Sequence, residues 1–221
     1  MLPKKYIRRG RTLYLQDEDI LVIGDIHFGK CKEVECDIDA EYTNKYKYIR
    51  NIISDLEPTT VILNGDIFYN PFIENWNPLR QDKKAIKILE KLQDSVNDFI
   101  LLKGNHELTL GGFTDNIKHK FKTEEYYEVS DNTIIHHGHD MPKKGYNNHI
   151  ISHMHPLRNG KPVFHFNEDL DNNSYTIVLP AFCKLVDGVD IRYYGGKCPV
   201  FDNGQKPEEY DFEEVTKNIY P

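Results

Sequence analysis

Short apolar runs that stop abruptly at polar residues constrain the fold of this chain more than any other feature. Residues 99–102 read Phe-Ile-Leu-Leu and lead within two positions into Gly104-Asn105-His106-Glu107. Uninterrupted apolar runs of this length are typical of strands that are buried on both faces. Four further motifs have the same character, and three of them also end an apolar run: Asp25-Ile26-His27, Gly65-Asp66, His136-His137-Gly138-His139 and His153-Met154-His155. Such side chains at strand ends are oxygen and nitrogen donors suited to divalent transition metals.

The first half of the chain alternates strands and helices. Apolar strands are expected at residues 20–24, 59–63 and 99–102, and helical spacing of apolar positions predicts helices at 38–56 and 79–96. A β-α-β-α-β series implies right-handed crossovers and a largely parallel sheet. The polar ends of its strands should therefore meet at one rim.

The pattern changes after residue 112, where helical spacing becomes rare. The segments that follow predict a second, more antiparallel sheet packed on the first: residues 126–129, 133–136, 149–151, 163–166, 175–179 and 189–194. We expect one domain over residues 1–221, with a basic N-terminal arm over about residues 1–11 and an acidic C-terminal tail over about residues 202–221. The arm is read either as a solvated edge strand or as a contact for nucleic acid.

Composition excludes some classes of protein. No apolar run approaches the roughly 18 residues of a membrane span, and the basic N-terminus lacks the apolar stretch of a signal peptide. We therefore expect a cytoplasmic protein without a membrane partner. The net charge of −7 argues against a broad basic face for nucleic acid, although bound divalent ions would offset part of that charge locally.

The four cysteines fit neither a CxxC pair nor zinc-ribbon spacing. They are Cys31, Cys36, Cys183 and Cys198. Reduced thiols are the expectation for a cytoplasmic protein, and a Cys31–Cys36 bridge remains the alternative.

The spacing of the motifs suggests individual roles. Asp25 and His27 point to the same side of an extended chain, so they can clip one ion. A carboxylate at Asp66 can bridge two ions at the roughly 3.5–4 Å separation that two-metal hydrolysis uses. Asn105 offers a neutral carbonyl oxygen, and His106 beside it can supply a proton without being tied to a metal.

The histidine-rich motifs complete this candidate site. His153 and His155 present two imidazoles on one face, and Gly138 lets the backbone bend close to an ion. The remaining histidines outside the motifs are read as packing or surface residues: His119, His149 and His165. The chain has no nucleophile elbow, phosphate-binding loop or dinucleotide motif, so metal-activated water is the favoured nucleophile.

These five motifs, in this order, resemble those of the calcineurin-like metallophosphoesterase superfamily. The resemblance covers roughly residues 10–195. Further short motifs make the chain similar to the small SbcD-related phosphoesterases of archaea and the DNA-ligase-associated phosphoesterases: Gly29-Lys30, Pro156, Leu179-Pro180-Ala181-Phe182 and Gly188-Val189-Asp190. The resemblance implies an α/β fold, a four-layer α/β/β/α sandwich of two packed mixed sheets with the site at the sheet rims.

The resemblance also implies a ligand set for two divalent ions, with Mn²⁺ expected and iron, zinc or nickel as alternatives. One ion would take Asp25, His27, Asp66 and His155. The other would take Asp66, Asn105, His137 and His153, with His139 in reserve for His137. His106 would stabilise phosphoryl charge and protonate the leaving alkoxide, as the catalytic residue. One departure is Ser152, where the family usually has glycine.

Three functions compete at this point. The first is a phosphodiesterase that hydrolyses nucleotides or small phosphodiesters by attack of metal-activated hydroxide. The second is a DNA or RNA nuclease of the SbcD type, which we expect to need a partner or a homodimer. The third is a non-catalytic scaffold. Four residues after the Asp66 motif are read either as the wall of a substrate pocket or as packing of a surface loop: Tyr69, Phe72, Trp76 and Arg80.

Overall fold

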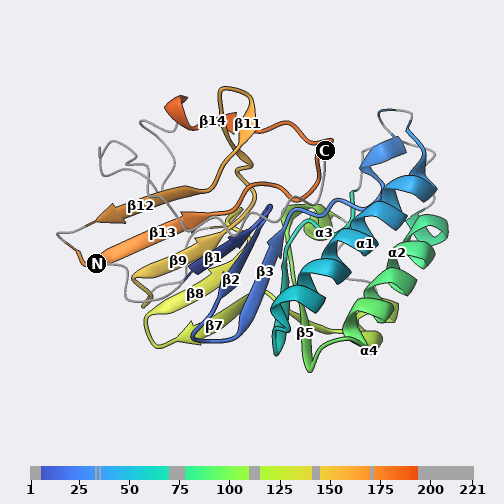
Figure 1. The fold of residues 1–221 in the computed structure, drawn as a ribbon, viewed down its shortest axis with the longest axis horizontal. Helices are drawn as coiled ribbons and strands as arrows, with labels where there is room; N and C mark the ends of the chain where they lie inside the picture. Colours follow the sequence, from blue (N-terminus) through green and yellow to red (C-terminus); the bar gives the residue numbers. More distant parts are fainter. Residues whose placement is uncertain are drawn as a thin grey trace.

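A computed structural model describes residues 6–32, 34, 36–69, 78–109, 115–140, 145–169 and 172–193 of the 221-residue chain. The expected loop at 70–77, with Phe72 and Trp76, and the acidic tail lie outside these residues. Figure 1 shows two large sheets facing each other, with helices on the outer side of one of them.

The first sheet has six strands and contains the expected parallel series. Its order is β1 (Tyr6–Arg9), β2 (Thr12–Leu15), β3 (Ile20–Gly24), β4 (Thr60–Asn64), β5 (Asp98–Leu102) and β6 (Lys122–Glu124). Strands β3 to β6 run parallel, and β1 and β2 form an antiparallel hairpin at the edge. The basic arm therefore contributes an edge strand, which is one of the two interpretations given for it.

Helices α1 (Ile38–Leu56) and α2 (Pro78–Gln93) cover the outer face of this sheet (Figure 1). The Asp37 side chain caps α1 by accepting from the backbone N–H groups of Asp39 and Ala40. Glu57 ends the helix in a left-handed conformation. The bounds that apolar spacing predicted for this helix, residues 38–56, are confirmed.

The second sheet has five strands and more parallel pairing than expected. Its order is β12 (His165–Asp169), β13 (Ser174–Val178), β9 (Asn148–Ile151), β8 (Thr133–His136) and β7 (Tyr126–Ser130). Only the two outer pairings are antiparallel, and β9 pairs in parallel with both of its neighbours. The second sheet is therefore mixed, with antiparallel pairs at its edges and parallel pairs at its centre, where β9 pairs in parallel with β8 and β13.

A third, small sheet joins β10 (Pro156–Arg158), β11 (Lys161–Pro162) and β14 (Val189–Asp190). The strand expected at 189–194 stops at Asp190 and continues as the 3₁₀ turn η2 (Ile191–Tyr193), so that prediction is wrong beyond its second residue. The remaining short helices are η1 (Lys30–Lys32), α3 (Asn105–Thr109) and α4 (Asp115–Lys120). None of the described helices combines the length and apolar character needed to cross a bilayer.

Two apolar layers hold the sheets in place. Leu21, Ile23, Leu63 and Leu101 pack against α1 and α2 in one layer. The alternate residues of the same strands face the second sheet, where they meet a second set of buried side chains: Val22, Ile62, Ile100, Ile135, Ile150 and Ile177. This packing confirms two stacked mixed sheets. The described helices α1, α2 and α4 lie on the first sheet's side, and a helical layer over the second sheet is not among the described residues.

Candidate metal centre

The candidate site forms where β3, β4 and β5 end side by side. Asp25 directly follows β3, Asp66 follows β4 after one glycine, and Asn105 begins α3 just after β5. Parallel strands bring their carboxyl ends to one edge, which is where open α/β sheets bind ligands. Backbone hydrogen bonds continue the pairing beyond the strands, from Asp25 N–H to the Gly65 carbonyl and from His27 N–H to the Asp66 carbonyl.

The backbone of the site is held in an unusual conformation. Nine non-glycine residues of the described chain have positive φ angles, and five of them are predicted metal ligands. These five are Asp25, His27, Asp66, His153 and His155, with φ between 45° and 66°. Left-handed backbone is costly for side chains of this kind and collects at functional sites. Asp25 and His27 therefore meet through a bend in the backbone, and the prediction that they share one side of an extended chain is wrong.

Asp66 lies at the centre of the site. Its Oδ1 is 3.3 Å from His137 Nε2, and its Oδ2 is 3.9 Å from His27 Nε2 and 3.7 Å from His106 Nε2. The Oδ1 atom also accepts a hydrogen bond from the His106 backbone N–H at 2.9 Å. Because the two carboxylate oxygens face different histidines, this side chain has the position that a bridging ligand requires.

The side chains around Asp66 fall into groups whose donor atoms lie within 4.8 Å of one another. One group is Asp25, His27 and His155, and another is Asp66, His137 and His153. Each group contains three of the four ligands expected from the sequence for one ion. A third group joins His27, Asp66 and His106, so His106 also lies close enough to reach an ion at this position.

Several histidines are oriented as metal ligands would be. His137 and His155 each donate from Nδ1 to a backbone carbonyl, that of Asn64 at 2.9 Å and that of Asp187 at 2.8 Å, which leaves Nε2 free to accept. Metal-ligating histidines commonly have this second hydrogen bond. Both ring nitrogens of His27 are buried and have no hydrogen-bond partner, an arrangement that a cation would satisfy. The donor set therefore fits two divalent ions.

Two glycines are required by this packing. A Cβ atom at Gly65 would lie 2.3 Å from His137 Nδ1, and one at Gly104 would lie 2.2 Å from Asp66 Oδ1. Gly65 also has a φ of +75°. The glycines in the Gly-Asp and Gly-Asn-His motifs thus allow the backbone to approach the ligands closely.

The structure distinguishes the two histidines that the sequence left open. His137 is almost fully buried and lies against Asp66, and its Nε2 is 3.2 Å from Asn105 Oδ1. His139 belongs to none of the ligand groups formed by the described residues, and its Nε2 lies 3.1 Å from the neighbouring Asp140. The departure at Ser152 also has a role, because its Oγ accepts a hydrogen bond from Asn64 at the end of β4.

The pKa values of the site's histidines shift in opposite directions. Burial lowers the pKa of His27 to about 3 and that of His153 to about 4. Burial also acts on His137, but the hydrogen bond and charge of Asp66 outweigh it and raise its pKa to about 9. The pKa of Asp66 falls well below its ordinary value, because the nearby histidines outweigh burial. Asp25, Asp66, His27 and His153 are thus favoured in the deprotonated forms that bind cations. The neighbouring carboxylates raise the pKa of His137 and His155 instead, so a cation would displace a proton from these two rings.

Sequence reasoning missed the role of Glu107. Its side chain is buried and accepts from four backbone N–H groups, those of Gly104, Asp66, Ile67 and Phe68, at 2.9–3.1 Å. Burial and the charge of Asp66 raise the pKa of Glu107 to about 7. This carboxylate ties the loop after β4 to the start of α3. An acidic residue closing the Gly-Asn-His motif was the available signal.

The segment after β13 is a second support that the sequence did not reveal. Backbone N–H groups of Phe182 and Cys183 donate to the carbonyls of Gly24 and Asp25. The carbonyl of Asp187 holds the ring of His155. The 179–190 motifs therefore position the ligands through backbone atoms, which side-chain patterns do not show.

A family model of calcineurin-like phosphoesterases matches residues 19–196, which include every predicted ligand. The chain belongs to this family. It is therefore a metal-dependent hydrolase that acts on phosphoester bonds. Among solved structures, the chain is similar to the nuclease MPE of Pseudomonas putida, with a TM-score of 0.58 and 18% sequence identity over 82% of each chain. No functionally curated protein matches the sequence.

Proposed function

We propose that this phosphoesterase hydrolyses phosphodiesters of nucleotides or of similarly small substrates, with two divalent ions of which Mn²⁺ is the first candidate. The observation that carries the proposal is the Asp66 carboxylate, whose two oxygens face histidines on opposite sides. A carboxylate placed in this way is the shared ligand of a two-metal centre.

Seven residues would provide eight ligand positions for the two ions, because Asp66 would bind both. Asp25, His27, Asp66 and His155 would hold one ion, and Asp66, Asn105, His137 and His153 would hold the other. When bound, the ions would supply Lewis acidity, which lowers the pKa of water toward neutrality and offsets the charge of the phosphoryl group. The protein orients these ligands through the backbone carbonyls of Asn64 and Asp187.

His106 would act on the leaving group. Its backbone N–H is fixed to Asp66, and its Nε2 lies 3.7 Å from Asp66 Oδ2 at the more exposed side of the site. Burial lowers the pKa of His106 despite the opposing charge of Asp66. A lower pKa makes the protonated imidazole a stronger acid, so its Nε2 is suited to donate a proton to a departing alkoxide.

Tyr69 and Lys30 support a small substrate with an aromatic group. The Tyr69 ring lies 5.3 Å from the His106 ring, and Lys30 Nζ donates to the Tyr69 hydroxyl at 3.0 Å. An aromatic face and a cation beside the reacting phosphate are the groups that bind a nucleobase and a second phosphate. Of the proposed pocket wall, Tyr69 lies at the site, while Phe72, Trp76 and the Arg80 side chain lie outside the described residues.

The metal-loaded chain should be tested on bis-p-nitrophenyl phosphate, a diester, and p-nitrophenyl phosphate, a monoester. We expect a higher kcat/KM for the diester, and a Tyr69→Ala variant should raise KM for cyclic nucleotides more than for the model diester. Faster hydrolysis of the monoester would contradict the proposal. Absence of hydrolysis in a chain that holds both ions would favour the scaffold.

A nuclease is the second candidate, favoured by the fold shared with nuclease MPE. Binding of duplex or single-stranded DNA whose affinity falls steeply with salt would support it, because phosphate contacts release counterions. Weak binding without salt dependence, together with turnover of small diesters, would favour the first candidate.

A further inference from the structure

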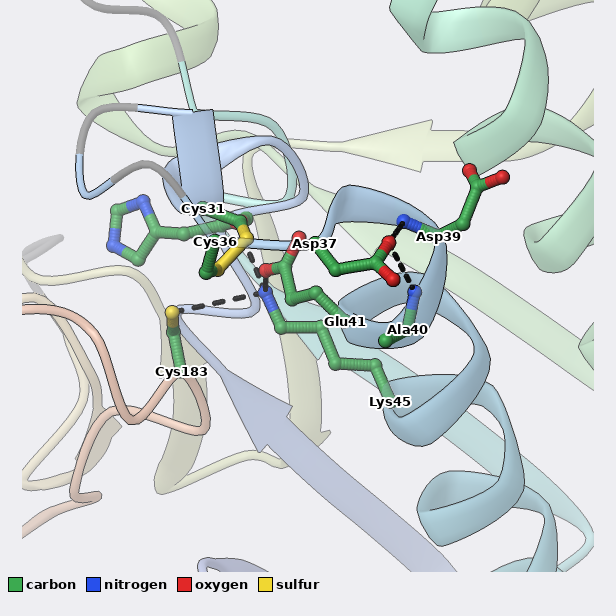
Figure 2. The surroundings of a disulfide bond; sticks show 9 residues. Cys31, Cys36, Asp37, Asp39, Ala40, Glu41, Lys45 and Cys183 are labelled. Carbon is green, nitrogen blue, oxygen red and sulfur yellow. Dashed lines mark hydrogen bonds and ion pairs between the residues drawn. A yellow bond between two sulfur atoms is a disulfide. The ribbon is translucent and has the colours of Figure 1, made fainter.

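A cavity of about 400 Å³ lies beside the N-terminal half of α1, next to the metal centre. It is lined by Cys36, Glu41, Lys45, Phe182 and Cys183 among others. Figure 2 shows three of the chain's four cysteines gathered around the Lys45 side chain, which reaches in from α1. None of the residues that line this cavity is a predicted metal ligand.

Lys45 is buried, with only 8% of its surface exposed, although it belongs to a helix that otherwise turns apolar residues inward. Its ammonium donates to the carbonyl of His27 at 3.0 Å, to Glu41 Oε1, and to the sulfur of Cys183 at 3.7 Å. A buried lysine is retained only when its charge is matched by such partners. The dashed lines of Figure 2 show this ammonium joining the Glu41 carboxylate to the Cys183 thiol.

Glu41 has one hydrogen-bonding position left over. Its side chain is 8% exposed, and its second oxygen, Oε2, is buried without a partner. A buried acceptor of this kind needs a donor. The thiol of Cys183, held on the same ammonium, is a group that can give up a proton to it.

The three cysteines are not equivalent. Cys31 and Cys36 form a disulfide in the structure, so the expectation of reduced thiols is wrong for this pair. Cys31 is fully buried, Cys36 is exposed and lines the cavity, and Cys183 carries the free thiol among the described cysteines. The cavity therefore brings one thiol and one sulfur of a disulfide into a common space.

We propose that this cavity is a thiol–disulfide exchange site in which Cys183 attacks the Cys31–Cys36 bridge at Cys36. The Cys183 thiol gives its proton to Glu41, and its sulfur forms a new bond to the sulfur of Cys36. The Cys31–Cys36 bond breaks, and Cys31 leaves as a thiolate that takes up the proton. One disulfide and one thiol are present before and after, so no external oxidant is consumed. Lys45 is a positioning residue, because its ammonium donates both to the Cys183 sulfur and to the Glu41 carboxylate.

The exchange is tested by mapping disulfides in the full chain with Cys198→Ser, which leaves these three cysteines. One equivalent of diamide oxidises the pair, and the protein is incubated, quenched in acid, labelled with N-ethylmaleimide and digested with trypsin without reduction. Because Lys32 separates Cys31 from Cys36, the three cysteines fall in different peptides. We expect both Cys31–Cys36 and Cys36–Cys183 peptides. Recovery of Cys31–Cys36 alone, with Cys183 labelled throughout, would overturn the proposal.

Two matched variants identify the sulfur that is attacked. With Cys198→Ser in both, Cys31→Ser leaves Cys36 and Cys183, and Cys36→Ser leaves Cys31 and Cys183. We expect the first to form its disulfide about tenfold faster, because bridging requires sulfurs that face each other. Equal rates would overturn the assignment of Cys36. If either variant fails to fold, the peptide map of the Cys198→Ser chain still decides.

Lys45→Met combined with Glu41→Gln tests the positioning role without leaving one buried charge unpaired. We expect exchange to slow by about tenfold, while the same two connectivities are finally reached. An unchanged rate of exchange in a folded variant would remove Lys45 and Glu41 from the proposed step.

Discussion

His136 and His137 are neighbours in sequence but lie in opposite environments. His137 turns into the metal centre, where the hydrogen bond and charge of Asp66 outweigh burial and raise its pKa to about 9. His136 turns into the second sheet, where its Nε2 lies 3.1 Å from His149 Nδ1, and burial and that neighbour lower its pKa to about 3. Both side chains are buried.

The difference shows what distinguishes His137, a predicted ligand, from a packed histidine. Burial alone keeps an imidazole neutral and satisfied by its neighbours, as in the His136–His149 pair. His137 has in addition a carboxylate close to its Nε2 and a carbonyl that holds its Nδ1, those of Asp66 and Asn64.

The largest effect is expected from Asp66→Asn. The neutral amide keeps the shape of the side chain but removes the charge that both ligand groups share. We expect loss of both ions by elemental analysis after dialysis, and activity that falls to the level of the metal-stripped protein. Retention of two ions per chain would contradict the bridging role.

The next effect is expected from His106→Gln. Turnover of a diester should fall by the 10²–10⁴-fold, approximately, that is typical of a lost general acid, while metal content stays at the wild-type level. Activity equal to wild type would remove the assignment. Loss of an ion would instead make His106 a ligand, as its place in the third donor group allows.

A smaller effect, on stability, is expected from Glu107→Gln. An amide places its NH₂ group against backbone N–H donors, and each buried donor left unsatisfied costs about 1–3 kcal/mol. Urea unfolding in EDTA measures this cost apart from metal binding. Glu90→Gln is the control, because its ion pair with Lys120 is partly exposed and such pairs contribute about 0–1 kcal/mol. Equal destabilisation by the two changes would contradict the role of Glu107.

The smallest effect is expected from His136→Gln, which keeps a donor for His149 but does not titrate. The low pKa of folded His136 means that only the unfolded chain takes up this proton between about pH 6.5 and pH 3. Wild-type stability should therefore fall as the pH drops through this window, by at most about 1.4 kcal/mol per pH unit for this group. The variant should show a shallower fall and unchanged metal content. A steeper fall would contradict the assignment.

Much of the fold follows from local signals. The apolar runs that became β3, β4 and β5 and the apolar spacing of α1 were sufficient to predict a parallel series whose ends meet. The motifs also identified the side chains that the structure brings together around Asp66. These features depend on neighbours in sequence, so they can be read from sequence.

The rest depends on contacts between distant segments. The burial of Lys45 in a helix face, the parallel pairing of β9 and the backbone support from residues 182–187 each involve partners far away in the chain. Strand 189–194 was overestimated because its pairing with β10 covers only two residues. The hydrophobic pattern of a segment does not indicate where its pairing with a neighbouring strand ends.

Anomalous diffraction from crystals soaked in Mn²⁺ tests the two-metal centre most directly. We expect two peaks that both lie within coordination distance of Asp66, one beside His27 and His155 and the other beside His137 and His153, with none at His136 and His149. Density in which Asp66 contacts fewer than two ions would contradict the account.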